Sequence, residues 1–108
     1  MALEHAQPGQ PVDVSPFGER LSQQATFAVF KAQHLEVMRL VLAAGKSLPP
    51  HKVPGEVTVL CIEGHLEVTT PTTCAVLAPG QLVLLPGGEV HSVRALEAAS
   101  ALVTVALR

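Results

Sequence analysis

The sequence has no Trp, no Tyr and only three Phe among its 108 residues. Its seven Lys and Arg residues form no basic run, and the net charge is −2 with His counted as neutral. Proteins that bind nucleic acid neutralise phosphates with clustered Lys and Arg, and those that bind single strands also stack bases on aromatic side chains. We therefore expect no nucleic-acid partner.

Signals for export, membrane insertion and disulfide formation are also missing. The first ten residues, MALEHAQPGQ, lack a basic segment followed by an apolar core. No uncharged stretch approaches the roughly 20 apolar residues of a transmembrane helix. The two cysteines, Cys61 and Cys74, do not form a CxxC pair. We expect a cytoplasmic protein with no membrane partner and two reduced thiols, in preference to a disulfide.

The residues that are present are typical of one compact domain, because 48% are hydrophobic and 15% are charged. Residues 1–24 are polar and contain several Pro and Gly, which predicts an irregular N-terminal arm. Residues 25–108 consist of short Val-, Leu- and Thr-rich runs divided by Gly and Pro. This pattern predicts a single domain that is an all-β sandwich or barrel. The predicted strands lie near residues 26–33, 35–43, 57–62, 65–70, 74–78, 82–85, 90–95 and 100–107.

Two turns and one charged pair complete this structural prediction. Glu63 and Gly64 are expected to form a tight hairpin between two alternating strands, with Gly64 at positive φ. The segment APGQ, residues 78–81, places Pro and Gly at the positions typical of a type II turn. Glu36 and Arg39 lie three residues apart on a predicted strand, hence on opposite faces, and we expect both to be solvated or interfacial.

Two motifs in this sequence resemble those of the cupin superfamily. The first cupin motif is G-x5-H-x-H-x3–4-E-x6-G, and the segment GKSLPPHKVPGEVTVLCIEG matches it at Gly45, His51 and Gly64. The second is G-x5-P-x-G-x2-H-x3-N, and GQLVLLPGGEVHSVRA matches it at its Gly, Pro, Gly and His positions, the last being His91. Ala95 stands where Asn is usual. The two motifs occur in the expected order and at the expected separation, so the resemblance predicts the fold.

The resemblance covers about residues 35–107 and implies a small single-domain cupin of the conserved-barrel type. Its fold is expected to be a double-stranded β-helix, an all-β jelly-roll barrel with a pocket in its mouth. Small cupins commonly form homodimers, either by exchanging N-terminal strands or by packing sheet on sheet. Residues 17–33 contain all three Phe, and we expect them either to serve as a dimer arm or to pack in the core of their own chain.

The resemblance also implies which positions would hold a metal. Cupins usually bind it through both histidines of the first motif, the Glu of that motif and the histidine of the second. Val53 and Val57 occupy the second-histidine and Glu positions here, so that only His51 and His91 remain. Two imidazoles alone usually bind a metal weakly, and a third protein ligand would have to complete the site.

Two residues are candidates for that third ligand. Alternation along the strand places Cys61 on the same inward face as Val57 and Val59, and a thiolate there would suit zinc, iron or copper. The alternative is that Cys61 is simply a small buried hydrophobic residue. Glu56 lies one residue from the carboxylate position, and it would face outward unless the backbone bulges there.

Three functions remain open. The first is binding of a small, partly apolar organic molecule, with His51 and His91 as polar contacts and Val53, Val57 and Val59 as the pocket wall. The second is a metal-dependent enzyme of the dioxygenase, isomerase or decarboxylase type, with one divalent transition metal (Zn, Fe, Ni or Cu) as cofactor. The third is a catalytically silent dimer that acts in protein interaction or sensing. The valines at ligand positions favour the first and third functions, and whether the protein is an enzyme stays open.

Overall fold

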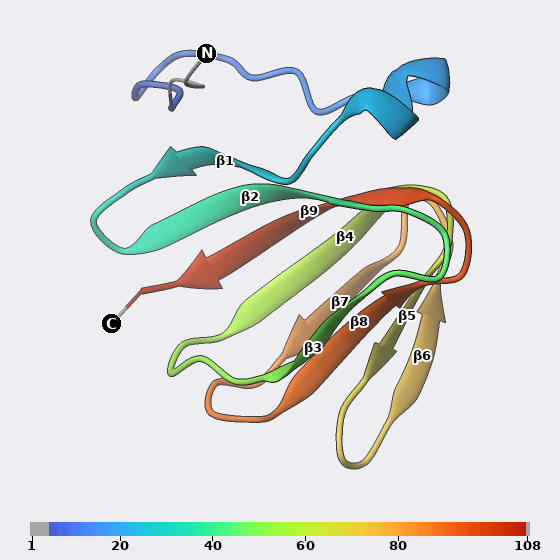
Figure 1. The fold of residues 1–108 in the computed structure, drawn as a ribbon. Helices are drawn as coiled ribbons and strands as arrows, with labels where there is room; N and C mark the ends of the chain where they lie inside the picture. Colours follow the sequence, from blue (N-terminus) through green and yellow to red (C-terminus); the bar gives the residue numbers. More distant parts are fainter. Residues whose placement is uncertain (1–4, 108) are drawn as a thin grey trace.

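The computed structural model describes residues 5–107, which form two antiparallel β-sheets facing each other (Figure 1). The elements in chain order are the 3-10 helix η1 (Gly18–Gln23), β1 (Phe27–Lys31), β2 (Leu35–Leu42), β3 (Ser47–His51), β4 (Val57–Glu63), β5 (Leu66–Thr69), β6 (Cys74–Leu77), β7 (Leu82–Leu85), β8 (His91–Ala95) and β9 (Ala99–Ala106). The strand orders are β1-β2-β9-β4-β7 in the five-stranded sheet and β3-β8-β5-β6 in the four-stranded sheet. From β2 onward the chain passes repeatedly between the sheets, so the predicted all-β jelly roll is confirmed. Among residues 5–107, no helix has the length and hydrophobicity that crossing a membrane requires.

The core lies between the two sheets and follows from the alternation of apolar residues along each strand. On β4, the side chains of Val57, Val59 and Cys61 are at most 3% exposed, whereas the residues between them are half-buried. On the neighbouring strand β9, Val103 is the partner of Val59, and Ala101 is the partner of Cys61. Burying a valine or leucine side chain contributes roughly 1.5–3 kcal/mol relative to leaving it exposed, so this inward row holds the sheets together.

Among residues 5–107, β3 is the strand that the sequence pattern does not predict. It contains Pro49 and Pro50, which lack an N–H group and obscure the alternation. The strand lies at a sheet edge and pairs only with β8, so the two prolines interrupt no central ladder. Its register is irregular between Leu48 and His51, and this irregularity leaves His51 directly opposite His91 on β8.

The prediction of a hairpin at Glu63 and Gly64 is wrong. Gly64 has the expected positive φ, 77°, but β4 and β5 belong to different sheets, so the turn carries the chain from one sheet to the other. Alternation cannot distinguish the two cases, because a hairpin and a sheet-to-sheet crossing both join alternating strands by a sharp reversal. A bulge between Cys61 and Glu63 turns Glu63 to the outer face of its sheet, where its Cα partner is Ser100.

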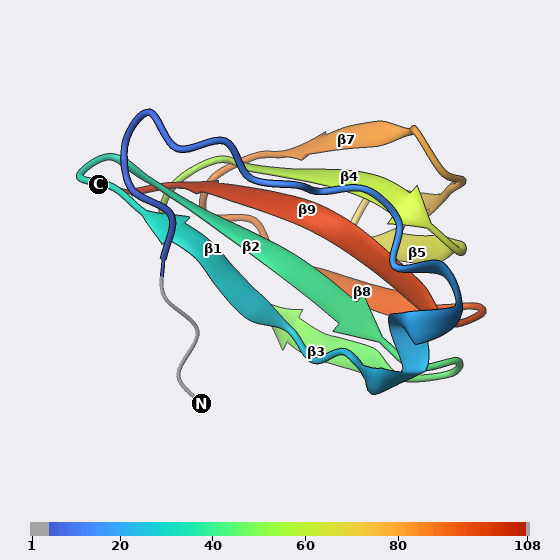
Figure 2. The same cartoon turned by 90° about the horizontal axis from the view of Figure 1, so that it is seen from above.

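The N-terminal arm crosses the outer face of the five-stranded sheet (Figure 2). The Ala6 N–H donates to the Val29 carbonyl at 2.9 Å, so the arm starts beside β1. It then runs over the sheet to η1, a helical segment within the arm that the prediction of an irregular arm did not include. Strand β1 pairs with β2 of the same chain, and Phe17, Phe27 and Phe30 are half-buried where the arm and the sheet meet. These aromatic residues pack on their own chain, outside the core between the sheets.

Arg39 is buried beneath this arm, contrary to the prediction that it is solvated or interfacial. It is 1% exposed, and its Nη2 donates to the Glu63 carboxylate (3.3 Å), to Ser100 Oγ (3.0 Å) and to the Ser15 carbonyl (2.9 Å). The Phe17 ring stacks over the guanidinium, 4.1 Å from ring centroid to Cζ, and the Phe17 N–H donates to Glu63 at 2.9 Å. This arm cluster joins the arm to the sheet. Alternation places Arg39 on the outer face of β2 but does not show what covers that face.

Candidate functional site

His51 and His91 lie opposite each other on neighbouring strands. His51 ends β3, His91 begins β8, and the two residues are Cα partners in the ladder. Their ring centroids are 4.5 Å apart, and the ring planes are inclined by 62°. His51 is exposed, whereas His91 is 5% exposed. The pairing of β3 with β8 therefore brings together the two histidines that the motifs single out.

Each imidazole contacts a backbone carbonyl through its Nδ1 atom. Nδ1 of His51 lies 3.2 Å from the Pro49 oxygen, and Nδ1 of His91 lies 3.3 Å from the Glu89 oxygen. A carbonyl oxygen only accepts hydrogen bonds, so these contacts place the proton of each neutral ring on Nδ1 and leave Nε2 with a free lone pair. Burial lowers the pKa of His91, the neighbouring His51 lowers it further, and the contact with Glu89 opposes them only in part. His91 is therefore neutral at pH 7.

Both imidazoles line an inner cavity of about 70 Å³ between the two sheets. Its other lining residues are all apolar: Met38, Leu40, Leu48, Val53, Val57, Val59, Val93, Val103 and Val105. The predicted pocket residues His51, His91, Val53, Val57 and Val59 thus surround one cavity. Their role in ligand binding stays a prediction.

An outer cavity of about 440 Å³ adjoins the inner one. The two cavities share Met38, His51, Val53 and Val105 as lining residues. The outer cavity is also lined by Glu36, which gives it a carboxylate that the inner cavity lacks. The inner cavity has about one sixth of the volume of the outer one, so it has room for a small group only.

Backbone contacts hold the loops that frame these cavities. The Gly88 N–H donates to the Val53 carbonyl at 2.7 Å, and the Ala106 N–H donates to the Glu56 carbonyl at 2.9 Å. A Cβ atom at Gly55 would lie only 1.9 Å from the Ala106 carbonyl oxygen, so this close approach requires glycine. These contacts within the chain fix the positions of the loops around both cavities.

Neither predicted third metal ligand lines the inner cavity. Cys61 is fully buried further along β4, where its Sγ lies 3.5 Å from the Gly64 oxygen and 3.6 Å from the Glu63 oxygen. Burial raises the pKa of the Cys61 thiol, so the sulfur stays protonated at neutral pH. Glu56 is exposed on the loop before β4. Among residues 5–107, no three His, Cys, Asp or Glu side chains form a group that could hold a metal, so these residues do not fit the usual cupin ligand set.

Several cavity residues were not predicted as part of the site: Met38, Leu40, Leu48, Val93, Val103 and Val105. Met38 and Leu40 are predicted only as residues of an apolar strand. Alternation along β2, β8 and β9 was a usable signal, because the cavity residues of each strand are two positions apart and share its inward face. Alternation does not indicate, however, which part of a core is hollow, because that depends on how the two sheets pack.

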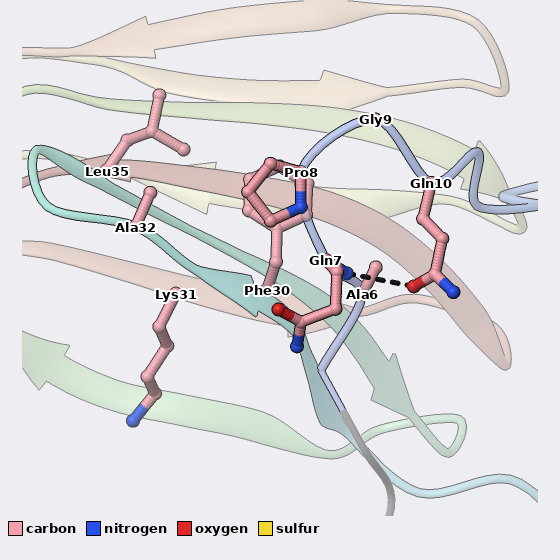
Figure 3. Close-up of a pocket in the computed structure, with 9 residues that line it drawn as sticks. All are labelled: Ala6, Gln7, Pro8, Gly9, Gln10, Phe30, Lys31, Ala32 and Leu35. Atoms are coloured by element: carbon pink, nitrogen blue, oxygen red, sulfur yellow. Dashed lines mark hydrogen bonds between the residues drawn. The ribbon is translucent and has the colours of Figure 1, made fainter.

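A different hollow, of about 410 Å³, lies between the arm and the turn from β1 to β2 (Figure 3). It is lined by Ala6, Gln7, Pro8, Gly9, Gln10, Phe30, Lys31, Ala32 and Leu35. The Gln7 N–H donates to Gln10 Oε1 at 2.9 Å, and this contact closes the arm's turn. The hollow is larger than the inner cavity, but it contains no histidine, cysteine or carboxylate that could act on a ligand.

Comparison of the sequence with models of protein families identifies the family, and the matched segment includes this site. A model of the cupin domain matches residues 38–106, a segment that starts within β2, ends with β9 and includes both histidines. The chain belongs to the cupin family. The membership of the cupin superfamily that the two motifs predicted is therefore confirmed.

Solved structures share this cupin fold. A conserved protein of unknown function from Streptococcus pyogenes is 23% identical, with a TM-score of 0.76 over 100% of this chain and 98% of that chain. A cupin superfamily protein from Desulfitobacterium hafniense is 14% identical, with a TM-score of 0.78 over 100% of both chains. The protein TT1209 from Thermus thermophilus is 31% identical, with a TM-score of 0.68 over 78% of this chain and 83% of that chain. No curated protein matches the chain in sequence.

Proposed function

We propose that this cupin binds a small, largely apolar molecule that donates a hydrogen bond to the imidazoles of His51 and His91. The observation that carries the proposal is the pair of rings, 4.5 Å apart, in a cavity whose other lining residues are all apolar. Because Nδ1 of each ring is bonded to the backbone, Nε2 is the nitrogen available to a ligand. Each Nε2 lone pair can accept a hydrogen bond and the other lining residues are apolar, so the cavity favours a ligand with a donor group.

The two cavities define the chemical class of this ligand further. A hydroxyl, amine or amide N–H group matches a pair of Nε2 lone pairs, whereas a carboxylate would place its own lone pairs against them. The small inner volume suits a compact aliphatic head group that carries the donor. Glu36 lines the outer cavity and favours a neutral or cationic remainder over an acidic one.

A titration with two matched probes tests the preference for a donor. The alcohol 2-methyl-1-propanol and the carboxylate isobutyrate share a carbon skeleton and differ in the head group. In 1H–15N spectra at about pH 7, we expect the alcohol to shift the amide resonances around His51 and His91, and isobutyrate to leave them unchanged. Equal binding of the two probes, or binding of isobutyrate alone, would refute the preference for a donor.

Matched histidine variants show whether the imidazoles make this contact. The double variant His51→Ala/His91→Ala should bind the alcohol at least about tenfold more weakly, which corresponds to about 1.4 kcal/mol. His65→Ala is the control, because His65 is half-exposed, does not line either cavity and lies beside Glu97 on the surface. This variant should bind like the wild type. Unchanged affinity in the double variant would exclude the two imidazoles as the polar contacts.

The metal-dependent enzyme has weaker support, because no third protein ligand accompanies the two imidazoles within residues 5–107. After incubation with zinc, iron, nickel or copper and removal of free metal, we expect elemental analysis to find well below one metal per chain. We also expect a chelator to leave the Tm unchanged, since a bound metal would contribute to stability. Near-stoichiometric metal that is lost in the His51→Ala/His91→Ala variant would overturn this expectation and establish a two-histidine metal site.

A further inference from the structure

The sheet edges formed by β6 and β7 carry no charge. From Val68 to Gly88 the sequence contains no Asp, Glu, Lys, Arg or His, and both strands lie within this segment. Exposed sheet edges in natural proteins usually carry charged side chains, especially Lys, because these prevent one edge from pairing with another. This pair of edges lacks that protection.

The same edges expose large apolar side chains. Leu82 and Leu84, two positions apart on one face of β7, are 63% and 58% exposed, and Val76 on β6 is 51% exposed. These are the most exposed large hydrophobic side chains of the described residues. Leu60 on β4 is half-buried, pairs with Leu82 and continues the apolar surface inward from the edge. An apolar stripe of this kind marks an interaction surface.

Of the other three edges, β1 is covered, β3 is blocked and β6 is less apolar than β7. The arm flanks β1 through the hydrogen bond from the Ala6 N–H to the Val29 carbonyl, and β1 ends in the charged residue Lys31. Strand β3 contains Pro49 and Pro50, whose missing N–H groups prevent regular pairing. Strand β6 is as neutral as β7, but it presents one strongly exposed large apolar side chain where β7 presents two. Strand β7 is therefore the edge best suited to pair.

We propose that two copies of this chain pair in antiparallel fashion through β7, so that their five-stranded sheets become one continuous sheet. Such a contact about a two-fold axis is isologous, because each β7 meets an identical strand. A charged side chain on β7 would lie close to the same charged side chain of the second copy near the two-fold axis. Because β7 is neutral, the two copies avoid this repulsion. A charged partner of another kind would find no opposite charge on β7. Leu82 and Leu84 of the two copies would cover one another and leave water.

This interface differs from the dimer arm that residues 17–33 could form. Strand β1 pairs with β2 of its own chain, and the arm cluster holds the arm on its own sheet. The uncovered edge of that sheet is therefore the opposite one, β7. None of the β7 leucines that would pair lines the inner or the outer cavity, so the proposed interface and the proposed ligand site can be tested independently.

Sedimentation equilibrium of the full chain tests the interface. The wild type should sediment at about twice the chain mass of 11.3 kDa. The variant Leu82→Lys/Leu84→Lys should dimerise at least about tenfold more weakly and approach the monomer mass. Leu96→Lys is the matched control, because Leu96 is 43% exposed and lies in the turn between β8 and β9. It should sediment like the wild type, and circular dichroism shows whether each variant is folded.

Hydrogen exchange on the wild type gives a second test, which holds even if the double lysine variant does not fold. The backbone N–H groups of β7 that do not donate a hydrogen bond to β4 should exchange slowly with solvent at high protein concentration, because the second copy protects them. They should exchange faster on dilution. A wild type that stays monomeric throughout the concentration range would overturn the proposal. A dimer whose β7 amides are unprotected, or a folded lysine variant that dimerises like the wild type, would overturn it as well.

Discussion

Replacing Gly64 with alanine should lower the free energy of unfolding by about 3–5 kcal/mol, enough to unfold a domain of marginal stability. Gly64 has a φ of 77°, which disfavours any residue with a Cβ. A Cβ atom there would also lie 2.2 Å from the Ala98 carbonyl oxygen and 2.8 Å from Ala99 Cα. Both are backbone atoms, and Ala99 begins the central strand β9 and is fully buried. The clash therefore has to displace a strand rather than a flexible side chain.

Gly80→Ala separates the clash from the backbone strain. Gly80 has a φ of 87° in the predicted type II turn, which is confirmed by the 3.0 Å hydrogen bond from the Gln81 N–H to the Ala78 carbonyl. A Cβ atom at Gly80 would meet nothing within 4 Å. This variant should therefore lose only the roughly 1–2 kcal/mol of left-handed strain. Chemical denaturation of both variants measures the difference, and equal losses would contradict the predicted clash at Gly64.

Changing Glu63 to Gln should destabilise the protein by about 3–5 kcal/mol, because it leaves a buried charge without its partner. Arg39 is 1% exposed, and its remaining partners, the Ser15 carbonyl and Ser100 Oγ, are neutral. Its Nε atom has no hydrogen-bond partner, so the guanidinium gains nothing there to offset the loss. The hydroxyl of Ser100 donates to Glu63 at 2.5 Å, and this charge-assisted contact weakens as well.

A double-mutant cycle with Arg39→Met measures the interaction itself. Arg39→Met removes the cation but keeps much of the apolar stem, and on its own it leaves the half-buried Glu63 carboxylate without a cation. The variant Arg39→Met/Glu63→Gln should be less destabilised than the sum of the single variants by about 1–3 kcal/mol. Urea denaturation gives the three values. Additive losses would mean that Arg39 and Glu63 contribute to stability independently of each other.

The arm cluster should also make stability depend on pH. Burial by itself raises the pKa of the Glu63 carboxyl, but hydrogen bonds from Ser100, the Phe17 N–H and the Gly18 N–H, together with the charge of Arg39, outweigh burial and lower it below 4.5. A carboxyl with a lowered folded-state pKa stabilises the protein above about pH 4.5, and this contribution is lost as the pH falls through the folded value. The difference in unfolding free energy between wild type and Glu63→Gln should therefore be smaller at about pH 3 than at about pH 7. An equal difference at both pH values would exclude the carboxylate charge as the cause of the destabilisation by Glu63→Gln.

Much of the fold and of the site could be predicted from local pattern. Alternation of apolar residues predicted every strand of the described chain except β3, where Pro49 and Pro50 hide the pattern. The cupin motifs predicted the two histidines as a pair, and the jelly-roll topology of the family is present. The same motifs showed valine at the missing ligand positions, and Val53 and Val57 do line the cavity with the histidines.

The sequence by itself therefore determined the all-β class, most strand positions and part of the inner cavity lining, namely His51, His91, Val53, Val57 and Val59. Period and motif spacing depend on neighbours along one strand, which is why a sequence shows them. Only the tertiary structure decided that Arg39 is buried under the arm and that Cys61 lies away from the cavity. It also decided that the turn at Gly64 crosses between sheets. Each of these features depends on which distant surfaces pack together. The free energy of that packing comes from contacts between remote parts of the chain, and the pattern of residues along one strand carries no information about those contacts.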